Sequence, residues 1–140
     1  MYDTILVPTD GSDQSEVALD HAVDMAQRHG SEVHLLYVAD TTRDSLTTQG
    51  GRVVDALERE GERIVSEALD RIGAGVDTVD AVLTGDPVET ILDYADSVDA
   101  GVVIMGTQGR RGLDRYLLGS TTERVVRLSS IPVLTLRSEE

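Results

Sequence analysis

The sequence predicts a single α/β domain in which a parallel β-sheet carries helices on both faces. With 140 residues the chain has the length of one domain. Short apolar runs alternate with longer amphipathic segments along it, and this alternation is typical of a parallel sheet with helical crossovers. One run, "GVVIM" at residues 101–105, is apolar on both of its faces, as in a central buried strand.

The first predicted strand is the run "TILV" at residues 4–7, which ends at the breaker Pro8. The polar stretch "TDGSDQSE" follows, and Asp13 with Glu16 resembles a capping box at the start of a helix. Apolar residues recur there at helical spacing until Gly30, which should end the helix.

The second predicted strand is "EVHLLYV" at residues 32–38, and a loop rich in Thr, Asp and Ser covers residues 39–50. A long amphipathic helix follows, and Gly73 ends it. The apolar face of this helix consists of Val53, Leu57, Ile64, Val65, Ala68 and Ile72.

The third predicted strand covers residues 76–84, where alternation is combined with β-branched residues. A third helix should follow directly. Asp86 is its predicted N-cap, Pro87 its first residue, and Glu89 lies at the capping-box offset.

Two more strands complete the predicted sheet. The fourth is the buried run at residues 101–105, and the fifth is "IPVLTL" at residues 131–136. A fourth helix between them should open at Ser120 and Glu123. In such folds ligands bind beyond the carboxyl ends of the strands, near the point where the strand order reverses.

Composition excludes several classes of function. The chain contains no cysteine, which excludes disulfides and thiolate metal sites, and its three histidines have no metal-ligand spacing. No apolar run approaches the roughly 20 residues of a membrane span, and the N-terminus does not resemble a signal peptide. We therefore expect a cytoplasmic protein that does not bind membranes.

The charge is strongly acidic. The formal net charge is −14, from 26 acids and 12 basic residues that are all arginine. This balance argues against nonspecific nucleic-acid binding, which depends on a broad basic surface. Concentrated salt would screen the self-repulsion, so the composition also suggests a halophilic type of protein.

The stretch "GTQGRRGLDRYLLGSTTERVV" at residues 106–126 runs against this balance. Residues 106–127 contain five arginines and two acids, a local charge of +3, while the other 118 residues carry −17. A Walker A loop is excluded because the chain has no lysine, and so is a receiver domain, whose family uses one after its fifth strand. The spacing also matches a dinucleotide fingerprint poorly.

The remaining interpretation is an anion-binding site formed by the backbone. Gly106 and Gly109 let the backbone approach a ligand closely or adopt positive φ. Gly119, Ser120 and Thr121 lie where a helix begins, so their N–H groups and the positive end of the helix dipole would point outward. The segment 120–123 is also compatible with an ordinary capping box that needs no ligand.

Four stretches of the chain carry a family resemblance: "ILVPTDGS", "TGDPVETIL", "VVIMGTQGRRGLDRYLLGSTTERVVR" and "IPVLTLR". The third contains the spacing G-x2-G-x9-G-[S/T], from Gly106 to Ser120. With these stretches the chain resembles the universal stress protein family over residues 2–137, and the glycine spacing resembles that of its ATP-binding branch. The resemblance implies an adenine-nucleotide site in a five-stranded α/β fold with strand order 3-2-1-4-5.

The resemblance also implies a role for each matching residue. Asp10 would accept a hydrogen bond from a ribose hydroxyl, and the backbone of Val38 would meet the adenine edge. Residues implied to lie along the base and ribose are Pro8, Thr9, Asp10, Val38, Met105 and Gly106. Residues implied to hold the phosphates are Gly109, Arg110, Gly119, Ser120 and Thr121, with Thr122 as a weaker candidate.

Three functions remain open on the sequence. The first is a nucleotide-dependent stress sensor or adaptor that binds ATP or another adenine nucleotide, with Mg²⁺ entering on the nucleotide. It would be a homodimer joined through strand 131–137, because an uncovered edge strand is a liability and family members commonly pair there. The second is an interaction module that binds an unknown protein partner without nucleotide. The third is an enzyme of the wider adenine-nucleotide-binding fold that cleaves at the α-phosphate. The sequence offers no obvious general base near the γ-phosphate, so any ATP hydrolysis would be slow.

Overall fold

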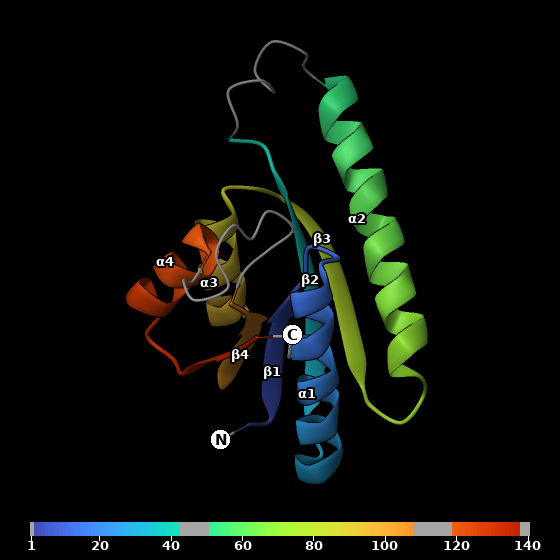
Figure 1. Ribbon diagram of the computed structural model, residues 1–140, viewed down its shortest axis with the longest axis vertical. Coiled ribbons are helices and arrows are strands. Elements are labelled where there is room, and N and C mark those ends of the chain that lie inside the picture. The colour runs from blue at the N-terminus through green and yellow to red at the C-terminus, as the bar shows by residue number, and fades with distance from the viewer. Residues whose placement is uncertain (1, 43–50, 108–118, 138–140) are drawn as a thin grey trace.

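The computed structural model describes residues 2–42, 51–107 and 119–137 of the chain. Strands and helices alternate along it, as the sequence predicts (Figure 1). In chain order the elements are β1 (Thr4–Pro8), α1 (Asp13–His29), β2 (Glu32–Asp40), α2 (Gly51–Ile72), β3 (Thr78–Gly85), α3 (Pro87–Ser97), β4 (Val102–Gly106), α4 (Ser120–Leu128) and β5 (Val133–Leu136).

The five strands form one parallel sheet in the order β3-β2-β1-β4-β5. Helices α1 and α2 cover one face, and α3 and α4 cover the other (Figure 1). The predicted three-layer fold and its strand order are confirmed. The chain leaves β1 toward β2 and β3 on one side and returns to β4 and β5 on the other, so the strand order reverses between β1 and β4.

Each face of the sheet carries its own apolar core. In β1 the side chains of Ile5 and Val7 enter the core under α1 and α2, while Leu6 enters the core under α3 and α4. All three are fully buried, because β1 is a central strand with a helical layer on each side. Strand β1 therefore contributes side chains to the apolar cores on both faces of the sheet.

Several predicted boundaries are corrected by contacts from other elements. Strand β2 continues to Asp40 because β3 pairs with it as far as Asp40 opposite Gly85. Strand β5 begins at Val133 rather than at residue 131, and the carbonyl of Pro132 accepts the N–H of Val103 just before it. The N-cap of α1 is Ser12 rather than Asp13, and its side chain accepts the N–H of Ser15 at 3.2 Å.

Helix α2 approaches β2 closely at a glycine. A Cβ atom added to Gly61 would lie 2.8 Å from Cε1 of Tyr37 and nearer still to its Cδ1. The Tyr37 ring cannot move aside freely, because the side chain is only 8% exposed and belongs to the core. Gly61 is therefore required by the packing of the two elements and not by its own backbone conformation.

We expect Gly61→Ala to destabilise the fold by about 1–2 kcal/mol. Alanine gains about 1 kcal/mol over glycine in a helix interior, but overpacking a core costs about 1–3 kcal/mol, and a Cβ this close lies toward the costly end. Urea unfolding measures the difference. Ser66→Ala, on the exposed face of the same helix, is the matched control and should stabilise by about 0.5 kcal/mol. A stabilised Gly61→Ala protein would contradict the packing argument.

A buried polar cluster lies on the α3 side of the sheet, near the amino end of β2. The His34 ring is only 7% exposed. Its Nε2 lies 2.7 Å from Glu32 Oε1, and its Nδ1 lies 2.8 Å from the hydroxyl of Tyr94 on α3. In the tautomer protonated at Nε2, His34 donates to Glu32 and accepts from Tyr94, so both ring nitrogens are satisfied.

Burial raises the pKa of the Tyr94 phenol above its usual value, and the negative charges of Asp80 and Glu32 add to the effect. As the pH rises, the unfolded chain therefore loses this proton before the folded protein does. The unfolding free energy should fall as the pH rises from about 10 through the folded pKa.

We expect Tyr94→Phe to lower the unfolding free energy by about 1–2 kcal/mol at pH 8, because His34 loses its hydrogen-bond donor. The variant should also show a shallower decline in stability at alkaline pH, because the phenol is absent. Urea unfolding at pH 8 and pH 11 measures both effects; a parallel decline in both proteins would contradict this account.

Candidate functional site

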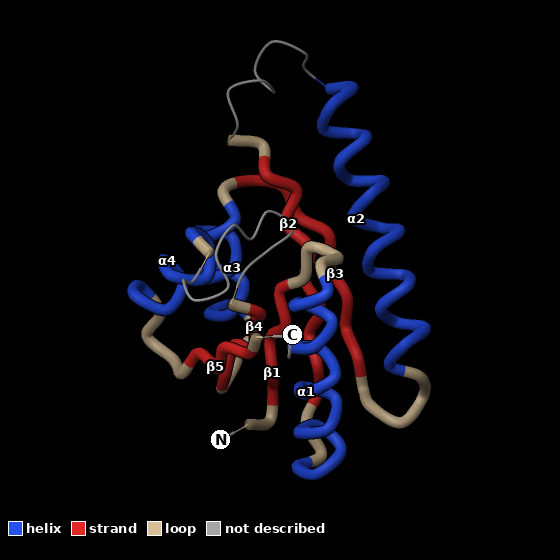
Figure 2. Tube along the Cα trace, in the orientation of Figure 1, coloured by secondary structure: helices blue, strands red, loops and turns tan. Residues whose placement is uncertain are grey.

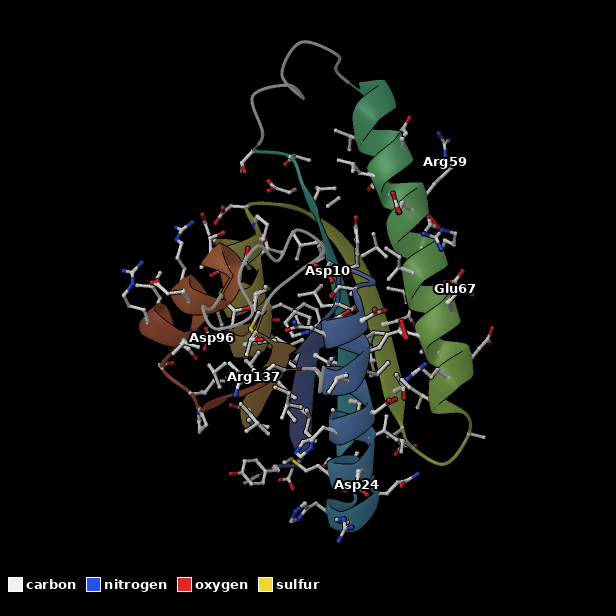
Figure 3. All side chains as sticks on the ribbon, in the orientation of Figure 1. Asp10, Asp24, Arg59, Glu67, Asp96 and Arg137 are labelled. Atoms are coloured by element: carbon white, nitrogen blue, oxygen red, sulfur yellow. The ribbon has the colours of Figure 1, made fainter. Side chains whose placement is uncertain are left out.

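The carboxyl ends of β1 and β4 lie side by side where the strand order reverses. The segment after β1 leads into α1, and the described residue after β4, Thr107, contacts the start of α4. Ligands of open parallel sheets bind at this position. Figure 3 labels Asp10 at this end of α1 and Asp24 toward the other end of the same helix.

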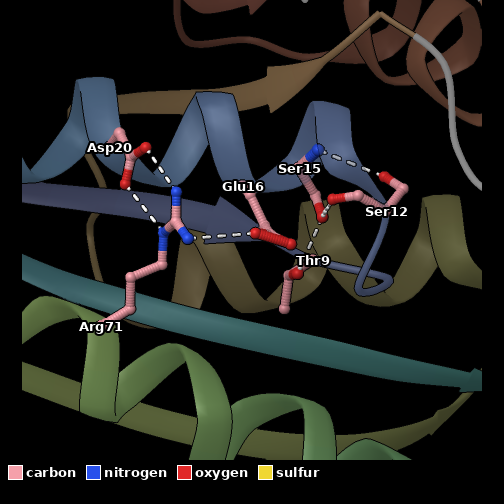
Figure 4. Close-up of polar contacts among 6 residues, drawn as sticks. All are labelled: Thr9, Ser12, Ser15, Glu16, Asp20 and Arg71. Atoms are coloured by element: carbon pink, nitrogen blue, oxygen red, sulfur yellow. Dashed lines mark hydrogen bonds and ion pairs between the residues drawn. The ribbon is translucent and has the colours of Figure 1, made fainter.

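The turn between β1 and α1 is held by its own polar side chains. Asp10 Oδ1 accepts the N–H of Ser12 at 2.9 Å. The hydroxyl of Thr9 donates to Ser15 Oγ at 3.1 Å and accepts the N–H of Gly11, as Figure 4 shows in part. Gly11 has a φ of 81°, a conformation that favours glycine. The turn after Pro8 therefore has a defined geometry before any ligand binds.

Strand β2 extends past the end of β1 together with β3 (Figure 2). The last residue of β1 paired with it is Pro8, opposite Leu36, and the carbonyl of Leu36 accepts the N–H of Thr9 at 2.8 Å. Backbone groups of a strand point to alternate sides, so those of Val38, two residues on, point in the same direction as those of Leu36. They face the space beyond the end of β1, where the polar edge of a planar ligand can form hydrogen bonds with them.

The end of β4 is packed tightly against α1. A Cβ atom at Gly106 would lie 2.8 Å from Gln14 Cβ and 2.9 Å from the carbonyl carbon of Gln14. The φ angle of Gly106 is not positive, so this glycine is explained by the close approach of α1 rather than by backbone freedom. The side chain of Met105 lies in the core under α3 and α4, which leaves only its backbone for a ligand.

Among the residues that the structure describes, no side chain caps the start of helix α4. Its N-cap is Gly119, and Ser120 is its first helical residue, so the predicted capping box of Ser120 and Glu123 is wrong. Glu123 pairs instead with Arg127 at 2.9 Å, one helical turn further on. Helices α1 and α3, in contrast, are capped by the side chains of Ser12 and Asp86. The start of α4 is thus suited to an anion, which would take the place of the missing cap.

Two hydrogen bonds attach the start of α4 to the end of β4. The N–H of Gly119 donates to the carbonyl of Thr107 at 2.6 Å, and the hydroxyl of Thr122 donates to the carbonyl of Gly106 at 2.9 Å. Thr122 is only 4% exposed, so its hydroxyl points into the protein and positions the helix. Ser120, in contrast, is exposed.

The described candidates therefore lie together at the carboxyl ends of β1, β2 and β4 and at the start of α4. Gly109 and Arg110 lie outside the described residues. Sequence reasoning missed Gln14 and Thr107. Their side chains are hydrogen-bonded at 2.6 Å although they lie 93 positions apart, and no local pattern reveals such a pair.

Among the described residues, no three acidic or histidine side chains are close enough together to hold a metal ion. In the same part of the chain, every helix is too short or too polar to span a membrane.

The model of the universal stress protein family matches residues 1–137 of the chain. Among curated proteins, a universal stress protein of Methanocaldococcus jannaschii is 35% identical over an alignment that covers 98% of this chain and 83% of the relative. The protein YxiE of Bacillus subtilis, also a universal stress protein, is 32% identical, with 98% of this chain and all of the relative covered.

Solved structures agree with these matches. The universal stress protein UspA of Lactobacillus plantarum superposes with a TM-score of 0.86 at 28% identity, covering 97% of this chain and 98% of its own. Another universal stress protein, determined in complex with cAMP, gives a TM-score of 0.77 at 28% identity over 99% of both chains.

Proposed function

Because this chain belongs to the universal stress protein family, we propose that residues 1–140 form one domain that binds an adenine nucleotide, with ATP and Mg²⁺ as the expected ligand. The start of α4 is the observation that carries this proposal. A helix whose N-cap is a glycine, with no capping side chain among the described residues, begins beside the end of β4, where the strand order reverses. The structural neighbour in complex with cAMP supports a ligand of this chemical class.

The base and ribose would lie over the ends of β1 and β2. The backbone of Val38 faces the space beyond β1 and offers the adenine edge a donor and an acceptor. Asp10 would accept from a ribose hydroxyl, with its carboxylate oriented by the N–H of Ser12. Pro8 and Thr9, together with the backbone of Met105 and Gly106, would complete the walls.

The phosphates would lie on the first turn of α4. The N–H groups of Gly119, Ser120 and Thr121 would donate to phosphate oxygens, and the exposed hydroxyl of Ser120 would add a donor. Gly109 and Arg110 are proposed as further phosphate contacts from the family resemblance alone. Thr122 takes a positioning role, because its hydroxyl is already bonded to Gly106. Mg²⁺ would enter on the nucleotide.

We propose that the protein binds the nucleotide rather than hydrolysing it rapidly, and that it acts as a stress-response sensor or adaptor in the cytoplasm. Its adaptation to high salt stays a prediction.

A homodimer is proposed through residues 131–137. Among the described strands, β5 pairs only with β4, and all four of its side chains are half-buried. A second copy of β5 would cover this edge, which sedimentation velocity can detect.

Two measurements test nucleotide binding directly. Denaturing the purified protein and analysing the released small molecules should yield an adenine nucleotide, and calorimetric titration of emptied protein with Mg-ATP should give a saturable isotherm. If no nucleotide is released and no heat of binding is observed, the proposal fails. The interaction module without nucleotide then becomes the better description of this fold.

A further inference from the structure

Residues Gly106 and Thr107, which we call the β4 junction, contact β5, α1 and the start of α4. The N–H of Thr107 donates to the carbonyl of Leu136 on β5 at 2.9 Å, and its own carbonyl accepts from Gly119 at the start of α4. On the opposite side, Gly106 packs against the backbone of Gln14 in the first turn of α1. The junction thus lies between the two helices that border the proposed site.

A side-chain hydrogen bond reinforces the contact with α1. The hydroxyl of Thr107 donates to Gln14 Oε1 at 2.6 Å. Thr107 is only 8% exposed, so water competes little for this bond, and breaking it would leave a buried hydroxyl and an amide oxygen to be satisfied in another way. Nothing in the local sequence around Gln14 requires this partner.

The proposed site has a ribose half, the turn that carries Asp10, and a phosphate half, the first turn of α4. Each partner of this bond is connected to one of the two halves. On the α1 side, Ser15 is the next residue after Gln14, and its hydroxyl accepts from Thr9 in the turn that carries Asp10. On the β4 side, Thr107 accepts from Gly119, the N-cap of α4. A chain of direct contacts therefore joins the ribose half to the phosphate half through the pair Gln14–Thr107.

We infer that Gln14 and Thr107 are positioning residues that fix the distance between the ribose half and the phosphate half of the site. This inference rests on the proposed function. The ribose and phosphates of a nucleotide are covalently linked at a set separation, so both halves can bind fully only if the protein holds them at that separation. A ligand without phosphates uses only one half and does not depend on the spacing.

The comparison of Mg-ATP with adenosine tests the inference. In Thr107→Val, which keeps the shape but removes the hydroxyl, we expect Mg-ATP affinity to fall about tenfold and adenosine affinity to change less than about threefold. Thr107→Ser keeps a hydroxyl and should restore most of the loss. Gln14→Met should reproduce the pattern independently if Thr107→Val does not fold. The double variant should lose less Mg-ATP affinity than the sum of the two single losses, because both variants break the same bond.

A matched control lies at the other end of the sheet. The hydroxyl of Thr78 on β3 donates to the carbonyl of Val76 at 3.2 Å, so Thr78→Val removes a comparable bond away from the site and should leave both affinities unchanged. Equal losses for Mg-ATP and adenosine, or additive losses in the double variant, would overturn the positioning role while leaving nucleotide binding intact. If the wild type binds neither ligand, the proposed function itself fails, and this inference fails with it.

Discussion

The Ser120→Asp variant is expected to be more stable than the wild type and yet to bind Mg-ATP about 100-fold more weakly. Ser120 is the exposed first residue of α4, and a carboxylate at a helix N-terminus stabilises by about 0.3–1 kcal/mol. The same carboxylate would lie about 4 Å from a bound phosphate. Repulsion at that distance ranges from about 1 kcal/mol in water to about 4 kcal/mol near a protein surface, and about 3 kcal/mol corresponds to 100-fold.

The opposite signs distinguish an anion site from an ordinary helix start. Urea unfolding measures the stability, and calorimetry at low ionic strength, where screening is weak, measures the affinity for Mg-ATP. Ser120→Asn is the size-matched control and should change both quantities little. Adenosine, without phosphates, should bind wild type and Ser120→Asp alike. Unchanged Mg-ATP affinity in Ser120→Asp would show that the phosphates bind elsewhere.

The Gly106→Ala variant is expected to lose about 2 kcal/mol of stability and most of its Mg-ATP affinity. Alanine in place of glycine usually gains about 0.5–1 kcal/mol inside a strand. Here the new methyl group would meet the backbone of Gln14 at 2.9 Å, and neither α1 nor β4 can yield without moving a whole element. An overpacking cost of about 3 kcal/mol, at the upper end of the usual range, therefore outweighs the gain.

Urea unfolding and Mg-ATP calorimetry on the same preparation measure both losses. Gly75→Ala is the matched control, because the nearest atom to a new Cβ there is Gln27 Nε2 at 3.9 Å, an ordinary contact. That variant should keep the stability and affinity of the wild type. If Gly106→Ala unfolds at the same urea concentration as the wild type, the close packing of α1 on β4 is not what requires this glycine.

The sequence predicted those parts of the fold whose signals are local. The run at residues 101–105 is apolar on both faces and is indeed a central strand, and Asp86 with Pro87 opens α3 as expected. Gly30 and Gly73 end their helices with φ angles of 67° and 76°. Each signal depends on a few neighbouring residues, which is why it can be recognised before the chain is folded.

The details that escaped prediction depend on distant partners. The length of β2 is set by its pairing with β3, and Gly61 is required by a tyrosine 24 positions earlier. The cap of α4 was misplaced by one residue, because Ser120 fits a capping box on spacing alone. At the candidate site, the resemblance supplied a set of residues, and the structure places its described members, all but Gly109 and Arg110, at the carboxyl ends of the strands and the start of α4. The bond between Gln14 and Thr107 has no counterpart in any local pattern.

Nuclear magnetic resonance of the isotope-labelled protein, titrated with Mg-ATP, tests the central claim most directly. We predict that the amide signals of Ser120, Thr121 and Val38 shift together with one dissociation constant, and that adenosine moves Val38 while leaving Ser120 in place. Saturable shifts confined to other parts of the sheet, with Ser120 and Thr121 unmoved by Mg-ATP, would contradict a phosphate site at the start of α4.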